Sequence, residues 1–251
     1  MNCTFATAFY DIGRGRWSSY KRTVEDYMNY FSTVSKLKAN LVIFCDEQHK
    51  EMISRIRGES EITKIVTVPF EQCEIYRNYY SRISEVMNSE LFKSRIIHKD
   101  IPEMNFPEYN IVNFNKICFV EEAMKLFDTK NYGWIDFGFG HGRVDVSMDL
   151  SFMDQKTLGD RIYMGCLRKP IDQMLYHPWS YFSNEIFITG SAFVGNDKSV
   201  VQFKHLACDV IDKSLSLSMI DDDQTIYNMA YLLNKNLFNL KVGSWFNQFG
   251  G

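Results

Sequence analysis

The sequence predicts an α/β, Rossmann-type fold in which a mixed, mainly parallel sheet is flanked by helices within a single domain. Short, apolar, β-rich segments at residues 4–10, 40–45 and 64–68 alternate with segments whose apolar residues recur every three or four positions. This alternation is typical of parallel sheets covered by helices on both faces. The 251 residues, 45% apolar and with a net charge of −3, are ordinary for one compact globular unit.

Each of the first three strands is followed by a predicted helix. Residues 20–37 carry one apolar stripe that starts at Tyr20, with charged side chains outside it. A second helix follows Asp46 and runs to residue 56, and a third spans residues 76–87. Apolar residues at these spacings lie on one face of a helix, so each helix is expected to pack on the sheet.

The middle of the chain is expected to connect two parts of the domain. Residues 98–110 contain Pro102 and Pro107 and show little periodicity, which predicts an irregular connection. A helix is then expected over residues 117–127. A fourth strand is expected over residues 132–136, ending in a glycine-rich turn.

The remaining elements are predicted by shorter patterns. Strict alternation of apolar and polar residues over 144–152 predicts a half-buried strand. Residues 185–189 resemble a strand that ends in a turn at residues 190–192. Two helices are expected in the last part, one over residues 200–211 and one that begins near Asp223.

Composition excludes several function classes. With 28 basic and 31 acidic residues there is no surplus of positive charge for non-specific binding to nucleic acid. The six cysteines are far apart and show no metal-ligand spacing, so we expect reduced thiols. The start of the chain lacks the basic region of a signal peptide, and no apolar stretch is long enough to span a membrane. We expect a cytoplasmic protein that can work at a membrane surface.

The first candidate site is the loop at residues 11–16, between the first strand and the first helix. Loops at the carboxyl edge of a parallel sheet bind ligands, and the arginines Arg14 and Arg16 could neutralise a pyrophosphate. The loop lacks the P-loop pattern G-x-x-x-x-G-K-[ST]. A plain turn with solvated arginines is the alternative interpretation.

The second candidate site is the segment at residues 134–143, which contains D-x-G-x-G-x-G after the fourth strand. This pattern imitates the nucleoside-binding loop of S-adenosylmethionine-dependent methyltransferases, although that loop should follow the first strand of its fold. Alternatively, Asp136 and His141 could hold a metal ion bound to a diphosphate, since Mg²⁺ and Mn²⁺ prefer oxygen ligands. A capped glycine turn is the purely structural alternative.

Two further candidate sites lie late in the chain. Asp221, Asp222 and Asp223 are adjacent and directly precede the last helix. Mutual repulsion raises the pKa of some members of such a group, which suits a general base, although one aspartate could simply cap the helix. The small residues Gly190 and Ser191 would permit the close approach of a ligand.

Residues 8–15, Lys21-Arg22 and residues 134–138 resemble the signatures of the HtrL/YibB group, also called WlaTC/HtrL, of bacterial proteins tied to lipopolysaccharide and capsule loci. The likeness covers essentially the whole chain. The group is similar to GT-A glycosyltransferases, so the resemblance implies a single GT-A-like domain over residues 1–251. Residues 1–142 would form its nucleotide-sugar-binding half and residues 143–251 its acceptor-binding half.

The resemblance implies a donor site in the first half. Tyr10, Asp11 and Gly13 would hold the base and ribose of the donor, and Arg14 or Lys116 would bind its phosphates.

A metal site is implied beside the donor. Asp136 would take the first place of the D-x-D motif that binds Mn²⁺ or Mg²⁺. Gly138 takes the second place, which is a departure from that motif, so Asp11, His141 or a carboxylate within residues 145–149 would have to supply the missing ligand.

The second half would bind the acceptor and carry the catalytic base. Gly190 and Ser191 resemble a glycine-containing loop on the acceptor side of GT-A enzymes, and Trp245 would stack on a sugar. Asp222 or Asp223 would remove the proton from the acceptor hydroxyl.

The function that these features predict is transfer of a sugar from a nucleoside diphosphate donor, such as a UDP-sugar, to a hydroxyl of a bacterial surface glycan. The enzyme would act in the cytoplasm, with peripheral association at the inner membrane, and would bind no nucleic acid. Two alternatives stay open: an S-adenosylmethionine-dependent methyltransferase, and a non-catalytic GT-A-like protein of a polysaccharide locus.

Overall fold

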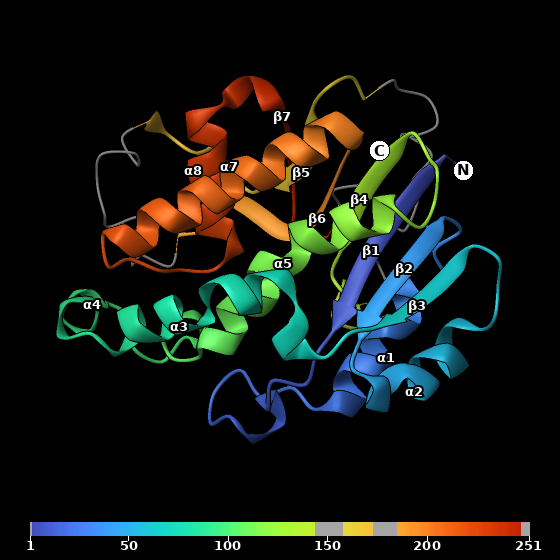
Figure 1. Ribbon diagram of the computed structural model, residues 1–251, viewed down its shortest axis with the longest axis horizontal. Coiled ribbons are helices and arrows are strands. Elements are labelled where there is room, and N and C mark those ends of the chain that lie inside the picture. Colours follow the sequence, from blue (N-terminus) through green and yellow to red (C-terminus); the bar gives the residue numbers. More distant parts are fainter. Residues whose placement is uncertain (1, 144–157, 173–184, 247–251) are drawn as a thin grey trace.

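A seven-stranded sheet forms the centre of the molecule (Figure 1). The computed structural model describes residues 2–143, 158–172 and 185–246. The strand order across the sheet is β3-β2-β1-β4-β6-β5-β7. The strands are β1 (Cys3–Phe9), β2 (Asn40–Cys45), β3 (Thr63–Thr67), β4 (Asn131–Ile135), β5 (Ile162–Cys166), β6 (Ile188–Gly195) and β7 (Phe238–Val242).

The sheet is mixed and mainly parallel, which confirms the predicted fold class. β1 pairs in parallel with both β2 and β4, β2 pairs in parallel with β3, and β5 pairs in parallel with β7. β6 runs antiparallel to its neighbours β4 and β5. The carboxyl ends of β1, β2, β3 and β4 therefore meet at one edge of the sheet, as the alternation of strands and helices predicted.

Helices cover both faces of the sheet, which separates two apolar cores (Figure 1). β1 shows the separation, because Phe5 and Phe9 face the core under α1 and α2, whereas Ala6 and Ala8 face the larger core under α3, α5, α7 and α8. The helices are α1 (Val24–Val34), α2 (Glu47–Arg57), α3 (Glu74–Asn88), α4 (Glu90–Arg95), α5 (Pro107–Met124), α7 (Asp197–Ser216) and α8 (Asp223–Leu233). Among the described residues, none of these helices is long and apolar enough to cross a membrane.

The predicted start of the first helix is wrong, because α1 begins at Val24 and not at Tyr20. Thr23 and Asp26 form a capping box in which the Asp26 N–H donates to Thr23 Oγ1 at 3.1 Å and the Thr23 N–H donates to Asp26 Oδ2 at 2.8 Å. Tyr20 has a φ of 55° and is exposed, so it belongs to the preceding loop.

The predicted connection at residues 98–110 is also partly wrong. Pro107 is the first residue of α5, a position that proline tolerates because its missing N–H would have no partner there. α5 is 18 residues long and buried on most of its circumference, including the polar residues Asn110, Asn115 and Lys116. Its lack of a single apolar stripe explains why its first three turns were not recognised in the sequence.

The turn predicted at residues 190–192 does not exist. Gly190 and Ser191 lie within β6, which continues to Gly195 and pairs with β4 through Ala192 opposite Ile135. The two further strands β5 and β7 were not predicted. The strand predicted over residues 144–152 lies outside the described residues.

Gly133 gives a test of the packing between β4 and the strands beside it. A Cβ atom at this position would overlap the carbonyl oxygen of Phe193 and lie 2.9 Å from the ring of Phe5. We expect Gly133→Ala to lower the free energy of unfolding by about 1–3 kcal/mol, measured by urea denaturation, because the strands must move apart.

The matched control for this prediction is Gly243→Ala, since a Cβ at Gly243 would contact nothing within 4 Å. We expect this variant to change the free energy of unfolding by less than about 0.5 kcal/mol. Equal stability of the two variants would show that β4 does not pack on β6 as described.

Candidate active site

A cavity of about 390 Å³ opens where the carboxyl ends of β1 and β4 meet α5, β6 and α8. The first residues of α8 lie on the far wall, so the cavity joins early and late parts of the chain. Most of the site residues predicted from the sequence line it, whereas Gly13 and Asp222 do not. Those that do are Tyr10, Asp11, Arg14, Lys116, Asp136, Gly138, His141, Gly190, Ser191, Asp223 and Trp245.

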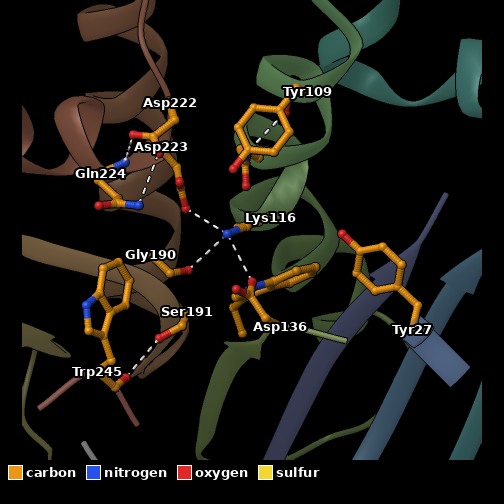
Figure 2. Close-up of polar contacts among 12 residues, drawn as sticks. Tyr27, Tyr109, Lys116, Asp136, Gly190, Ser191, Asp222, Asp223, Gln224 and Trp245 are labelled. Carbon is orange, nitrogen blue, oxygen red and sulfur yellow. Dashed lines mark hydrogen bonds and ion pairs between the residues drawn. The ribbon is translucent and has the colours of Figure 1, made fainter. Parts of the chain in front are cut away.

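Lys116 lies at the centre of the polar contacts in this cavity (Figure 2). Its ammonium nitrogen is 2.8 Å from Asp223 Oδ2 and 3.0 Å from Asp136 Oδ1, and it donates to the carbonyl oxygen of Gly190 at 3.1 Å. The ammonium group has three hydrogens, so these three acceptors account for all of them. Burial lowers the pKa of Lys116, but the two carboxylates outweigh it, so the pKa rises and the side chain stays charged.

Asp136 is held by one of its two carboxylate oxygens. Oδ1 accepts from Lys116 and also from the indole Nε1 of Trp134 at 2.7 Å. The backbone N–H of Asp136 donates to the carbonyl oxygen of Ser191 at 2.8 Å. No described residue hydrogen-bonds to Oδ2, and the side chain is 34% exposed, so Oδ2 is available to a ligand in the cavity.

Gly190 provides the space that Asp223 occupies. A Cβ at Gly190 would overlap the carboxylate of Asp223, with Cγ at 2.6 Å and Oδ1 at 2.8 Å. The small residue is therefore required because an aspartate lies directly against β6. The spacing of small residues had predicted close approach of a ligand, and the structure shows close approach of a side chain of the same protein.

Asp221 and Asp222 do not line the cavity. Asp222 caps α8, since its Oδ1 accepts from the Gln224 N–H at 3.0 Å and its Oδ2 accepts from Gln224 Nε2 at 3.1 Å. Asp221 accepts from the Thr225 hydroxyl at 2.7 Å. Burial, followed by the charges of neighbouring carboxylates that include Glu103, raises the pKa of both aspartates well above the ordinary value.

Burial also raises the pKa of Asp223 above its usual range, and the positive charge of Lys116 opposes this rise. Asp223 is therefore the one member of the aspartate run that combines contact with the cavity, an ion pair and a carboxylate held against a strand. The sequence indicated the group, but only the structure distinguishes its members.

Two residues predicted for donor binding also brace the cavity wall. The Tyr10 hydroxyl donates to the carbonyl oxygen of Val68 at 3.1 Å, and its ring packs between Phe70 and Phe119. The guanidinium of Arg14 donates to Tyr20 and Tyr27 from a largely buried position.

The structure shows the backbone or packing environment of one glycine in each candidate loop, Gly13 and Gly138. Gly13 adopts a φ of 79°, and its N–H donates to Asp11 Oδ1 at 2.9 Å, which forms the tight turn after β1. A Cβ at Gly138 would lie 3.4 Å from the rings of Tyr27 and Tyr30. The two tyrosines therefore cover the position where a D-x-D motif would project its second carboxylate.

His141 and Trp245 flank the opening of the cavity. The imidazole of His141 packs against Tyr30 and Phe246, with ring centroids 5.7 and 5.4 Å apart. This partial burial, together with the charge of Arg22, lowers the pKa of His141 to about 4, so the ring is neutral at pH 7. Trp245 and Tyr27 lie on opposite sides of the Lys116 contacts in Figure 2.

The described part of the chain holds no group of three histidine, cysteine, aspartate or glutamate residues arranged to bind a metal ion. The open Oδ2 of Asp136 supplies one hard oxygen ligand, and the neutral imidazole of His141 is in a protonation state that suits metal binding. A Mg²⁺ or Mn²⁺ ion can be held by one or two carboxylates when phosphate oxygens and water complete its shell. Asp136 and His141 fit a metal ion that has one or two protein ligands, and no larger set of ligands is present among the described residues.

Several polar side chains of the cavity were not predicted from the sequence, and Arg22 and Gln224 are two of them. Arg22 lines it just before the cap of α1, and Gln224 lines it one residue after Asp223. The Gln224 Oε1 atom is buried and has no hydrogen-bond partner among the described residues. Both residues adjoin segments that were candidate sites or family signatures in the sequence, and this proximity was the sequence feature that could have indicated them as cavity residues.

Fold and cavity together define a mixed α/β protein with a cavity lined by charged side chains at the carboxyl edge of its parallel strands. The chain belongs to the family described as "Bacterial protein of unknown function (HtrL_YibB)", which it matches over residues 1–250. It is 30% identical to the protein HtrL of Escherichia coli (strain K12) over 262 aligned positions, which cover 98% of this chain and 90% of that protein. The resemblance inferred from the sequence is thereby confirmed.

A solved structure with a similar arrangement is that of mouse xyloside xylosyltransferase 1 in its apo form. The TM-score is 0.49 with 9% sequence identity, and the match covers 99% of this chain and 90% of that one.

The central ion pairs make stability depend on pH in a Lys116→Met variant. The substitution leaves Asp136 and Asp223 without their cation and raises the pKa of Asp223 further, since Lys116 is what lowers it. The folded variant then binds a proton more tightly than the unfolded chain, so its stability falls as pH rises through the raised pKa of Asp223. We expect urea denaturation to show a loss of about 3–5 kcal/mol at pH 8 and a smaller loss at pH 5.

The control for this prediction is the double variant Lys116→Met with Asp223→Asn, which removes one of the stranded charges. We expect it to recover part of the stability at pH 8 and to lose most of the pH dependence. A loss that is the same at both pH values and in both variants would mean that the unpaired charge of Asp223 does not cause it.

Proposed function

We propose that this protein is a glycosyltransferase that moves a sugar from a nucleoside diphosphate donor to a hydroxyl of a bacterial surface glycan, such as lipopolysaccharide or capsule. The observation that carries the proposal is the cavity in which Asp136, at the end of β4, and Asp223, at the start of α8, are joined through Lys116. One carboxylate with a free oxygen and one buried carboxylate are the two acidic groups that such a transfer needs on its donor and acceptor sides.

The donor would lie between β1 and β4. The backbone and side chains of Tyr10 and Asp11 form the wall there, which suits the base and ribose, and Asp136 Oδ2 would face the diphosphate. Mn²⁺ or Mg²⁺ bound at Asp136, with His141 as a further ligand, would neutralise the negative charge that develops on the leaving diphosphate. Trp134 and Lys116 hold the other oxygen of Asp136, which fixes the carboxylate in place.

The acceptor would enter from the side of Ser191 and Trp245. Asp223 would accept the proton of the acceptor hydroxyl as the new bond to the anomeric carbon forms and the bond to the diphosphate oxygen breaks. The charge of Lys116 favours the ionised form of Asp223, because it lowers the pKa that burial raises. Gln224, which lines the same cavity, would contact the acceptor sugar.

We place this reaction in the cytoplasm, at the inner face of the membrane, where nucleotide sugars and lipid-linked acceptors meet. The acceptor-binding half of the domain would bind the glycan, and no nucleic acid would take part in the reaction.

A binding panel tests the class of ligand. We expect isothermal titration calorimetry to detect one of UDP, GDP and CMP, with UDP as the first choice, and to find tighter binding in the presence of Mn²⁺. Replacement of Asp136 by Asn should remove the metal-dependent part, because it removes the negative charge of the cavity carboxylate proposed to hold the metal ion.

Three other results of the panel would each change the proposal. Binding that ignores Mn²⁺ would show that Gly138 marks the loss of the metal site. Binding of S-adenosylhomocysteine alone would indicate a methyltransferase. No binding of any member would indicate a protein that retains the fold without the activity.

The assignment of Asp223 as base predicts different outcomes for two adjacent residues. Asp223→Asn should lower the turnover number by about 10²–10⁴-fold, since the amide cannot accept the proton. Asp222→Asn should keep turnover, because asparagine caps a helix as well as aspartate and the side chain does not line the cavity. The measurement is release of the nucleoside diphosphate from the donor that the panel identifies, and equal loss in both variants would contradict the assignment.

A further inference from the structure

Arg14, Arg22 and Lys116 are the arginine and lysine side chains among the described residues that line the cavity. The ammonium group of Lys116 contacts Asp136, Asp223 and the Gly190 carbonyl oxygen, which together accept its three hydrogens. Its charge is therefore already balanced by two carboxylates. An anionic ligand needs a cation that is not balanced in this way.

Arg14 is also committed to the protein. Its Nε and Nη2 donate to the carbonyl oxygen of Tyr20 at 3.3 and 3.1 Å, and its Nη1 donates to the Tyr27 hydroxyl at 2.7 Å. The guanidinium carbon lies 5.3 Å from the ring centroid of Trp17 and 5.5 Å from that of Tyr109. A planar cation held by aromatic faces and carbonyl oxygens braces the loop and has little freedom to follow a ligand.

The loop that Arg14 braces is the one that presents Arg22. Arg14 fixes Tyr20, whose φ of 55° turns the chain, and the Arg22 N–H donates back to the carbonyl oxygen of Arg14 at 3.4 Å. Thr23 then caps α1, so Arg22 stands between a tied loop and a capped helix. Its backbone is fixed although its side chain is not.

The Arg22 side chain is half-buried and has no hydrogen bond or ion pair to any residue that the structure describes. The charge of Arg22 adds to the Thr23 hydrogen bonds that lower the pKa of Asp26, but no ion pair joins the two described side chains, so the five N–H donors of Arg22 stay available to the oxygens of a phosphate. Together with burial, its charge lowers the pKa of His141, so it faces the part of the cavity where His141 lies.

We infer that Arg22 binds the diphosphate of the donor and that Arg14 is the positioning residue that holds the Arg22 loop. This inference rests on the proposed function and deepens it, because it assigns the phosphate contact to a residue other than Arg14 and Lys116. The ligand group is a pair of linked phosphates next to Asp136.

Calorimetry with three probes isolates the phosphate contact: the nucleoside diphosphate that binds the wild type, its parent nucleoside, and inorganic pyrophosphate. Arg22→Met should weaken binding of the diphosphate by about 10- to 100-fold and leave binding of the nucleoside unchanged, because a lost charged hydrogen bond affects only the phosphates. Arg22→Lys should fall between this variant and the wild type, since it keeps the charge but not the planar fork. Binding of pyrophosphate by the wild type that is lost in Arg22→Met would show that the phosphates alone are recognised.

Lys21→Met is the matched control, because Lys21 is the adjacent, exposed residue and its loss changes the net charge equally. It should leave all three affinities unchanged, and Arg14→Met should lower the thermal unfolding midpoint as well as the affinity. An equal effect of Lys21→Met, an equal loss of nucleoside binding in Arg22→Met, or unchanged diphosphate binding in Arg22→Met would each overturn the assignment. If the wild type binds no nucleoside diphosphate, the proposed function fails with it, whereas normal wild-type binding with an unaffected Arg22→Met variant removes this inference alone.

Discussion

The rest of the site depends on the buried ammonium group of Lys116. It contacts Asp136 after β4, Gly190 in β6 and Asp223 at the start of α8, and it comes from the middle of α5. Elements from the middle and the end of the chain therefore meet at one charge. A buried lysine is tolerated only when acceptors surround it, and the buried carboxylate of Asp223 is stabilised by the adjacent cation. The charges of Lys116, Asp136 and Asp223 therefore stabilise one another.

Some charges of the cavity are paired within the protein, and others are left open to a ligand. The charge of Lys116 is used to hold the carboxylates and that of Arg14 to hold a loop, so both serve the geometry of the site. Asp136 keeps one oxygen open, and Arg22 keeps its guanidinium unpaired among the described residues. The fixed charges cost nothing further when a ligand arrives, which is how a preorganised site stabilises charge in a transition state.

The periodicity of the sequence predicted the first half of the fold well. The β2 strand has the predicted bounds, and α2 and α3 follow it as expected, because short local patterns decide these elements. Two predictions were wrong: the start of the first helix at Tyr20 and the turn at Gly190, which lies within β6. A capping box outweighs the apolar spacing at Tyr20, and Gly190 is small because a distant aspartate packs against it.

The sequence by itself determined the α/β class, the run of aspartates before the last helix and the loop after β1, since composition and spacing are properties of the chain alone. Only the tertiary structure decided which aspartate faces the cavity, that Lys116 is an internal counter-ion, and that Arg22 is the unpaired cation of the described wall. The reason is that charge pairing and burial depend on which side chains approach each other across the fold. No spacing along the chain encodes that Lys116 and Asp223, 107 positions apart, share a hydrogen bond.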